Sequence, residues 1–160
     1  MNGKTIIRPE PLQLDRRFDA PRALVFKAWT TADHIKNWFS PATFTTPEAT
    51  IDCRPGGVFD VCMQAPDGQQ FWNRGRFIDV VENESLSFEA GAHVDNSGNA
   101  PFAVRTYVTF TDDGEGCLMS VRQEYEIYDE SALAMIGGAP EGWRTTLDKL
   151  EREVARIKAG

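Results

Sequence analysis

The chain has 160 residues, of which 41% are hydrophobic, and its 17 lysines and arginines are outnumbered by 24 aspartates and glutamates, for a net charge of −7. This length suits one domain with its own core. The acidic balance argues against nucleic acid or an anionic membrane as partner, since phosphate groups attract a surplus of Lys and Arg. No run approaches the ~20 apolar residues of a membrane span.

The first elements in the chain are a strand and two short helices. Residues 12–18 alternate apolar and polar side chains, a pattern typical of a half-buried strand. Asp19 and Pro21 then predict a helix start, with Asp19 as the capping side chain, and Arg22 to Thr30 carries apolar residues at helical spacing. Thr31 repeats the capping signal, and Ser40-Pro41 ends the second short helix.

The middle of the chain changes to strand periodicity. Turn signals such as Asp67-Gly68 and Asp113-Gly114 separate the apolar runs, and residues 94–100 are polar and loop-like. Up to six consecutive strands are predicted here, over residues 49–54, 59–64, 71–81, 86–89, 106–111 and 117–128. Short turns between them favour an antiparallel meander.

The chain ends in one long amphipathic helix. From Trp143 its apolar residues recur at steps of 4, 3, 4 and 3, and the charged residues Lys149, Glu151, Arg152 and Arg156 are expected to face water. The segment Ser131 to Pro140 before it is small and glycine-rich, and is either a mobile lid hinged at Gly137-Gly138 or a plain connector. The predicted class is α+β: a curved antiparallel sheet of six to seven strands wraps this helix and leaves a cavity beside it.

Four strings in this order resemble a known family. They are the strand-to-helix junction at residues 18–29, the Asn-Trp-Phe-Ser-Pro segment at 37–41, the Arg-Pro-Gly-Gly turn at 54–57, and Gly142-Trp143 with Leu147 and Leu150 in the closing helix. Together they are similar to the activator of heat-shock-protein-90 ATPase homologue-like family of the START-like (SRPBCC) helix-grip superfamily.

The resemblance implies a single START-like domain over residues 12–158, with residues 1–11 as an N-terminal extension. It also implies a cytoplasmic protein whose cavity suits apolar or amphipathic small molecules, with no assigned reaction. The three cysteines, odd in number and far apart, agree with a reducing compartment. The co-chaperone that names the family has a further N-terminal, chaperone-binding domain; we expect that domain and its chaperone interaction to be missing here.

The motifs for metal, phosphate or nucleophilic chemistry are missing from the sequence. His34 and His93 are the only histidines, and neither has partners at metal-ligand spacing; Cys53 and Cys62 supply half a zinc site at most. No cofactor, metal or catalytic residue is therefore predicted. His34 is interpreted as a solvated or capping residue, whereas His93, in a loop or at a strand edge, is the better potential acid or base.

Two amides on apolar strand faces are the most informative polar residues. Alternation places Asn73 with Phe71 and Phe77, and Gln123 with other inward residues of its strand. Because an unpaired buried amide costs about 1–3 kcal/mol, each needs a partner in the core, a bound water or a ligand. A β-bulge near Gly75 would reverse the first of these faces.

The predicted function is binding of an apolar or amphipathic small molecule between the sheet and the last helix. The alternatives are a chaperone-linked or stress-related interaction module and a cyclase- or hydrolase-like enzyme using the same cavity. The sequence is also compatible with a homodimer formed through a strand edge or through the N-terminal strand. The predicted ligand-binding residues are Phe59, Phe71, Asn73, Phe77, Val108, Phe110, Val121, Gln123, Tyr125, Trp143 and Leu147.

Overall fold

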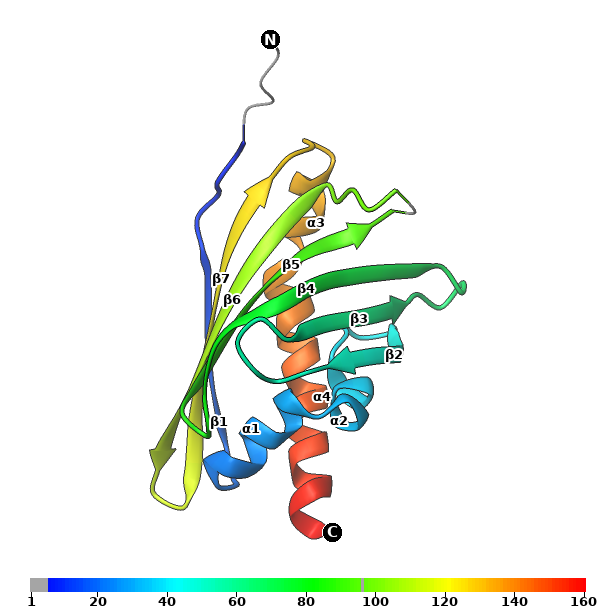
Figure 1. The fold of residues 1–160 in the computed structure, drawn as a ribbon. Coiled ribbons are helices and arrows are strands. Elements are labelled where there is room, and N and C mark those ends of the chain that lie inside the picture. Colours follow the sequence, from blue (N-terminus) through cyan, green and yellow to red (C-terminus); the bar gives the residue numbers. More distant parts are fainter. Residues whose placement is uncertain (1–5, 96) are drawn as a thin grey trace.

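A seven-stranded antiparallel sheet forms most of the molecule (Figure 1). The computed structural model describes residues 6–95 and 97–160. Its strand order is β1-β7-β6-β5-β4-β3-β2. The strands are β1 (Leu12–Phe18), β2 (Thr45–Ile51), β3 (Val58–Gln64), β4 (Gln70–Val81), β5 (Ser85–Val94), β6 (Phe102–Asp113) and β7 (Gly116–Ile127). Strands β2 to β7 thus follow one another as a meander, and β1 pairs with β7.

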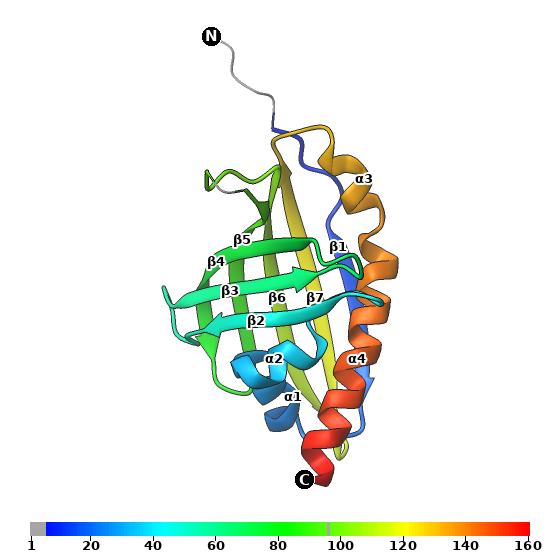
Figure 2. The same ribbon diagram turned by 90° about the vertical axis from the view of Figure 1, so that its right-hand side faces the viewer.

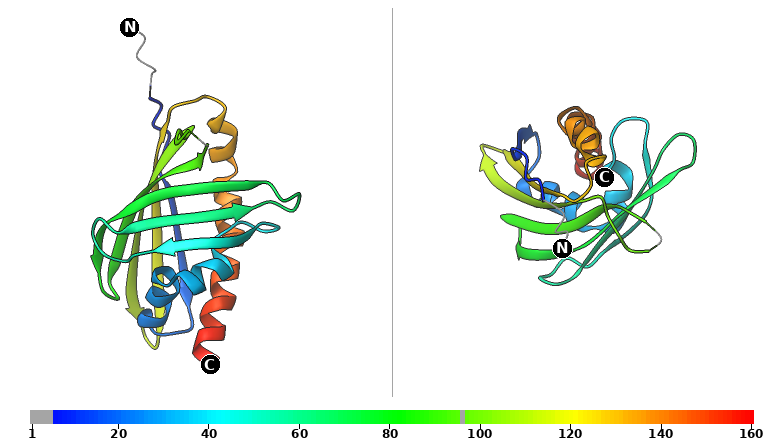
Figure 3. Two further views of the ribbon diagram at one scale, coloured as in Figure 1. Left: turned by 45° about the vertical axis from the view of Figure 1, so that its right-hand side comes forward. Right: turned by 90° about the horizontal axis from the view of Figure 1, so that it is seen from above.

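The described residues also form four helices, and the longest lies in the curve of the sheet. They are α1 (Arg22–Thr30), α2 (Ala32–Trp38), α3 (Ala132–Gly137) and α4 (Ala139–Ala159). Figure 2 shows β2 to β4 crossing β6 and β7 at a steep angle, so the sheet is strongly twisted. Seen from above, the sheet curls around α4 (Figure 3). The α+β class, the curved sheet, the long closing helix and the two short helices after the first strand are confirmed.

Several details differ from the sequence-based expectations. Strand β5 runs on to Val94 because the small residues 90–92 pair along β4 and β6, although they carry little strand propensity. Neither Asp19 nor Thr31 caps a helix with its side chain; the first N-cap position belongs to Pro21. Residues before β1 also join the sheet, since Ile7 exchanges two backbone hydrogen bonds with Ile127.

Two apolar clusters occupy the concave side of the sheet. The larger one is built around α1 and α2, where Trp29 and Trp38 are fully buried. Within it the rings of Phe59 and Phe88 stack with centroids 4.0 Å apart. The smaller cluster contains Ala92, Phe102, Tyr125, Ile127 and Ala132. The concave side therefore contains two separately packed regions.

Helix α4 packs on the sheet through its apolar seam, but Lys149, which is expected to face water, does not do so. Leu147, Leu150 and Val154 are buried as the spacing indicates. The ammonium of Lys149 turns inward and donates to Ser40 Oγ and to two backbone carbonyl oxygens at 2.8–3.0 Å. Glu153 is also buried. Both residues tie α4 to the α2 region of the chain.

Candidate functional site: a cavity between the sheet and helix α4

A cavity of about 390 Å³ lies between the two apolar clusters. Its wall includes Phe39, Phe59 and Phe88 of the larger cluster, and Phe102 and Tyr125 of the smaller one. Strands β3 to β7 form one side; α3, the first turns of α4 and the segment that follows α2 form the other. The cavity exists because the two clusters pack separately and do not contact each other beneath α4.

The structure divides the predicted ligand-binding residues into two groups. Those in the cavity wall are Phe59, Phe71, Asn73, Gln123, Tyr125 and Trp143. Those outside the wall, in the larger packed cluster, are Phe77, Val108, Phe110, Val121 and Leu147. Helix α1 explains part of this division: Phe26 sits edge-to-face on Phe110 at 5.5 Å, and α1 packs on both β6 and β7. Phe110 is therefore covered by a helix side chain, whereas the ring of Phe77 packs edge-to-face on the rings of Phe59 and Phe88.

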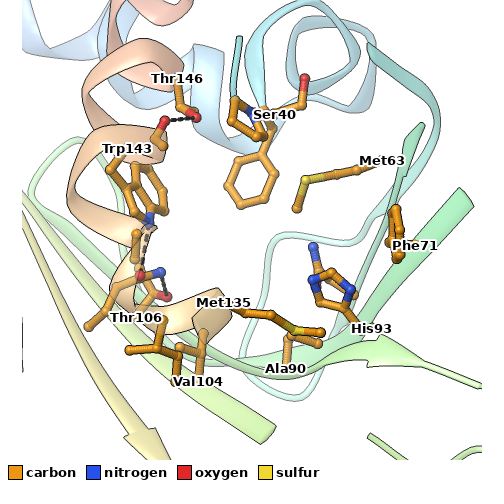
Figure 4. Close-up of a pocket in the computed structure, with 18 of the residues that line it drawn as sticks. Ser40, Met63, Phe71, Ala90, His93, Val104, Thr106, Met135, Trp143 and Thr146 are labelled. Atoms are coloured by element: carbon orange, nitrogen blue, oxygen red, sulfur yellow. Dashed lines mark hydrogen bonds between the residues drawn. The ribbon is translucent and has the colours of Figure 1, made fainter. Parts of the chain in front are cut away.

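Gln123 is held by a network of protein partners (Figure 4). Its Oε1 accepts hydrogen bonds from the Tyr125 hydroxyl and from Trp143 Nε1, both at 2.8 Å, and its Nε2 donates to Thr106 Oγ1 at 3.1 Å. This network joins β6, β7 and α4 across one side of the cavity. The buried amide of Gln123 therefore finds its hydrogen-bond partners within the protein core.

Asn73 faces the cavity without any such network. The register of β4 with β3 is continuous from Gln70 to Arg76, so β4 has no bulge at Gly75, and Arg74 lies outward with its guanidinium 4.0 Å from the Trp72 ring. Gly75 is required for close approach of the strands, because a Cβ there would lie 2.7 Å from the Cα of Ala90. The Asn73 side-chain amide makes no hydrogen bond within the described residues, although the residue is only 9% exposed.

A β-bulge lies directly opposite Asn73, in β5. Trp72 pairs with Val94 and Arg74 with Gly91, so the two residues Ala92 and His93 oppose Asn73 alone. His93 adopts a φ of +56°, a left-handed conformation that costs energy in most residues. As a result, two consecutive residues, Ala92 and His93, both line the cavity.

His93 lies among aromatic rings and lacks polar partners. Its ring centroid is 4.7 Å from that of Phe71 and 5.9 Å from that of Phe102. Nδ1 is buried without a hydrogen-bond partner among the described residues, and burial lowers the pKa of the imidazole. The sequence predicts a loop or a strand edge at His93, but the structure places this residue in a bulge inside β5. The bulge has no sequence signature beyond the tolerance of His for positive φ.

The segment before α4 forms part of the cavity wall. The predicted lid or connector contains α3, and its Met135 lies at the cavity wall (Figure 4). Ile136, Gly138 and Ala139 also line the cavity. Met135 is 43% exposed, so this wall is thin and borders solvent. Sequence reasoning also missed Phe39, Pro41 and Phe44, although the Asn-Trp-Phe-Ser-Pro string carried two of them.

No charged side chain contributes to the cavity wall in the described part of the chain. Its polar residues are Ser40, Asn73, His93, Thr106, Gln123, Tyr125 and Thr146. Burial raises the pKa of the Tyr125 hydroxyl to about 12, so this group is neutral at pH 7. Residues 6–95 and 97–160 contain no group of three or more side chains able to hold a metal ion. The arrangement suits an apolar guest with a neutral polar end.

His34 lies outside the cavity and contacts a buried carboxylate. Its Nδ1 is 2.7 Å from Glu153 Oε2, which also accepts from Asn37 Nδ2 at 3.0 Å and from the Arg156 guanidinium. This corrects the interpretation of His34 as a solvated or capping residue. Burial disfavours the Glu153 carboxylate, but the hydrogen bonds from Arg156, Asn37 and His34 outweigh it and hold its pKa at about 2.

Within the described residues, no helix is both long enough and apolar enough to cross a bilayer.

Solved structures of bacterial proteins share the fold. A protein from Nitrosomonas europaea is 26% identical with a TM-score of 0.77, covering 94% of this chain and 97% of that one. One from Chromobacterium violaceum is 25% identical with a TM-score of 0.78, covering 90% and 96%. The AHSA1 protein from Silicibacter pomeroyi, at 21% identity and a TM-score of 0.77, covers 92% and 99% and supports the fold alone. No curated protein matches the sequence.

The family assignment rests on a match over most of the chain. The family model described as Activator of Hsp90 ATPase homolog 1-like protein matches residues 19–155. Members of this START-like fold family generally bind hydrophobic ligands. With the curved sheet, the closing helix and the cavity between them in place, the chain belongs to the Activator of Hsp90 ATPase homolog 1-like family.

Proposed function

We propose that this protein binds an apolar or amphipathic small molecule in the cavity between the sheet and α4. The observation that carries the proposal is the cavity itself, about 390 Å³ with a wall made mostly of aromatic and aliphatic side chains. Ligand sites in proteins typically measure about 300–1,000 Å³ and combine apolar walls with a few polar groups. The six predicted residues in the wall would then contact the guest directly.

Burial of hydrocarbon supplies the driving force. Each CH₂ removed from water contributes about 0.8 kcal/mol, so affinity should increase with chain length until the cavity is full. The uncharged wall adds no attraction for an ion, whereas a buried unpaired charge would be costly. The expected guest is therefore mainly apolar. The three unpaired cysteines support a reducing compartment such as the cytoplasm as the place where binding occurs.

Native mass spectrometry and a fluorescent probe test the proposal. Protein purified from cells is expected to retain a small-molecule adduct, and N-phenyl-1-naphthylamine is expected to bind saturably with increased fluorescence. Ala92→Trp would place a large ring in the void from β5 and abolish probe binding.

Thr109→Trp is the matched control, because Thr109 is exposed on β6. The same ring added there should leave probe binding unchanged. Absence of any adduct together with absence of saturable probe binding would reject the proposal. Equal binding by wild type and a folded Ala92→Trp variant would place the probe elsewhere and count equally against it.

A further inference from the structure

The polar side chains of the cavity wall that make no hydrogen bond within the described residues lie together, at the bulge in β5. Elsewhere in the wall, Gln123 is engaged with Tyr125, Trp143 and Thr106, and the Thr146 hydroxyl donates to the Gly142 carbonyl at 2.7 Å. The side chains of Asn73 and His93, opposite each other at the bulge, make no hydrogen bond within the described chain. An occupant's polar end therefore finds its unused partners there.

The burial of His93 determines which hydrogen-bonding group its ring offers. Neither ring nitrogen makes a hydrogen bond within the described residues. Nδ1 is buried, whereas Nε2 is accessible. A proton on Nδ1 would be a buried N–H with no acceptor, a rarer state in proteins than an unpaired acceptor. The neutral ring should carry its proton on Nε2, and an imidazolium would be disfavoured because it needs protons on both nitrogens. His93 thus offers one N–H donor.

The surroundings do not favour an anionic polar end. Neither Lys nor Arg lines the cavity in the described part of the chain. Lys149 lies behind Ser40, but its ammonium already makes three hydrogen bonds, to the Ser40 hydroxyl and the carbonyl oxygens of Pro41 and Phe44. A carboxylate placed here would lose its hydration and gain no opposite charge, so its binding is disfavoured.

Resting on the proposed binding function, we propose that the occupant carries an uncharged hydrogen-bond acceptor, such as a ketone, ester or amide carbonyl, that receives N–H donors from Asn73 and His93. The amide of Asn73 supplies Nδ2–H from β4, and the imidazole supplies Nε2–H from the β5 bulge. Figure 4 shows His93 at the cavity wall beside Phe71 and Ala90, so the remainder of the guest would extend among apolar groups. His93 and Asn73 thereby determine ligand class.

Three ligands of nearly equal shape test the proposal. They are 4-phenylbutan-2-one, the 3-phenylpropanoate anion and isopentylbenzene, compared at pH 8 by displacement of N-phenyl-1-naphthylamine. The ketone is expected to displace the probe at a concentration at least tenfold below that of the carboxylate and several-fold below that of the hydrocarbon. Asn73→Leu removes one of the two donors and should reduce the advantage of the ketone over the hydrocarbon several-fold.

Two further variants separate recognition from folding. Gln13→Leu replaces an exposed amide on β1 and should leave the ketone preference intact. His93→Asn keeps an N–H donor and tolerates positive φ, so it should retain part of the preference that His93→Phe loses. In ¹⁵N–¹H correlation spectra, the His93 proton should reside on Nε2, and the Nε2 resonance should shift when the ketone binds.

The possible failures are distinct. If the probe binds but the carboxylate displaces it as well as the ketone does, or if the proton resides on Nδ1, the assignment of ligand class is overturned and the proposed function stands. If the probe does not bind and no ligand of the trio shifts the His93 resonances, both proposals are overturned.

Discussion

At the scale of single residues, the buried carboxylate of Glu153 is the most constrained charge in the described chain. It is only 4% exposed and accepts hydrogen bonds from His34, Asn37 and Arg156, which connect α2 with α4. An acidic residue in this position stabilises the fold only while its partners remain in place, because removing one side of a buried polar contact leaves the other unsatisfied.

Glu153→Gln is expected to lower the free energy of unfolding by about 1–3 kcal/mol at pH 7, since it removes the charged acceptor and leaves its donors poorly matched. Glu151→Gln, on the exposed face of the same helix, is the control and should change stability by less than about 0.5 kcal/mol. Urea denaturation of the three proteins measures both effects. Equal stability of the two variants would contradict this account.

The same carboxylate gives a pH dependence with a definite sign. Its folded-state pKa of about 2 lies below the ordinary value of 4.5, so the unfolded chain binds more protons between these values. The contribution of Glu153 is therefore complete above pH 4.5 and decreases as the pH falls toward 2. The difference in melting temperature between wild type and Glu153→Gln should narrow over this range, and a difference independent of pH would rule out the linkage.

At the scale of elements, two glycines show opposite requirements. A Cβ on Gly75 would collide with the Glu89 carbonyl oxygen and lie 2.7 Å from Ala90 Cα, because β4 and β5 approach closely there. A Cβ on Gly142, in α4, would meet only Pro41 Cβ, at 3.8 Å. Position 75 therefore requires glycine so that the two backbones can pack closely. At position 142 glycine is not required, and it destabilises the helix through its greater conformational entropy in the unfolded chain.

Matched alanine substitutions test this difference. Gly75→Ala is expected to destabilise the protein by about 3 kcal/mol through forced separation of two strands. Gly142→Ala should stabilise it by about 1 kcal/mol, or roughly 2–4 °C in melting temperature, from improved helix propensity. Thermal unfolding followed by circular dichroism measures both. Similar changes in melting temperature for the two substitutions would contradict the account, because they would show that β4 and β5 tolerate a Cβ at position 75.

The elements themselves were largely predictable because they depend on local patterns. Period-two alternation placed Asn73 and Gln123 on inward faces, and the 4-3-4-3 spacing defined α4. The bulge at His93 was not predictable, since the mismatch of one residue between β4 and β5 is a property of the pair. The inward turn of Lys149 likewise depends on where α4 meets the segment after α2.

At the scale of the whole molecule, the order of four short strings was enough to predict family and fold, because it reflects the sequence of elements. Which inward residues line a void could not be predicted in the same way. Phe110 and Phe59 both point inward from strands, but α1 covers the first and the cavity borders the second. That distinction depends on how far α1 and α2 fill the curve of the sheet.

The central claim is that the cavity between the sheet and α4 receives the ligand, and methionine methyl NMR tests it most directly. Met63 and Met135 line the cavity, whereas Met119 is fully buried in the larger cluster with its sulfur 3.2 Å from Trp29 Nε1. With ¹³C-methyl methionine, saturation with N-phenyl-1-naphthylamine should shift the Met63 and Met135 resonances and leave Met119 nearly unchanged. Saturation that leaves both Met63 and Met135 unmoved would contradict the account.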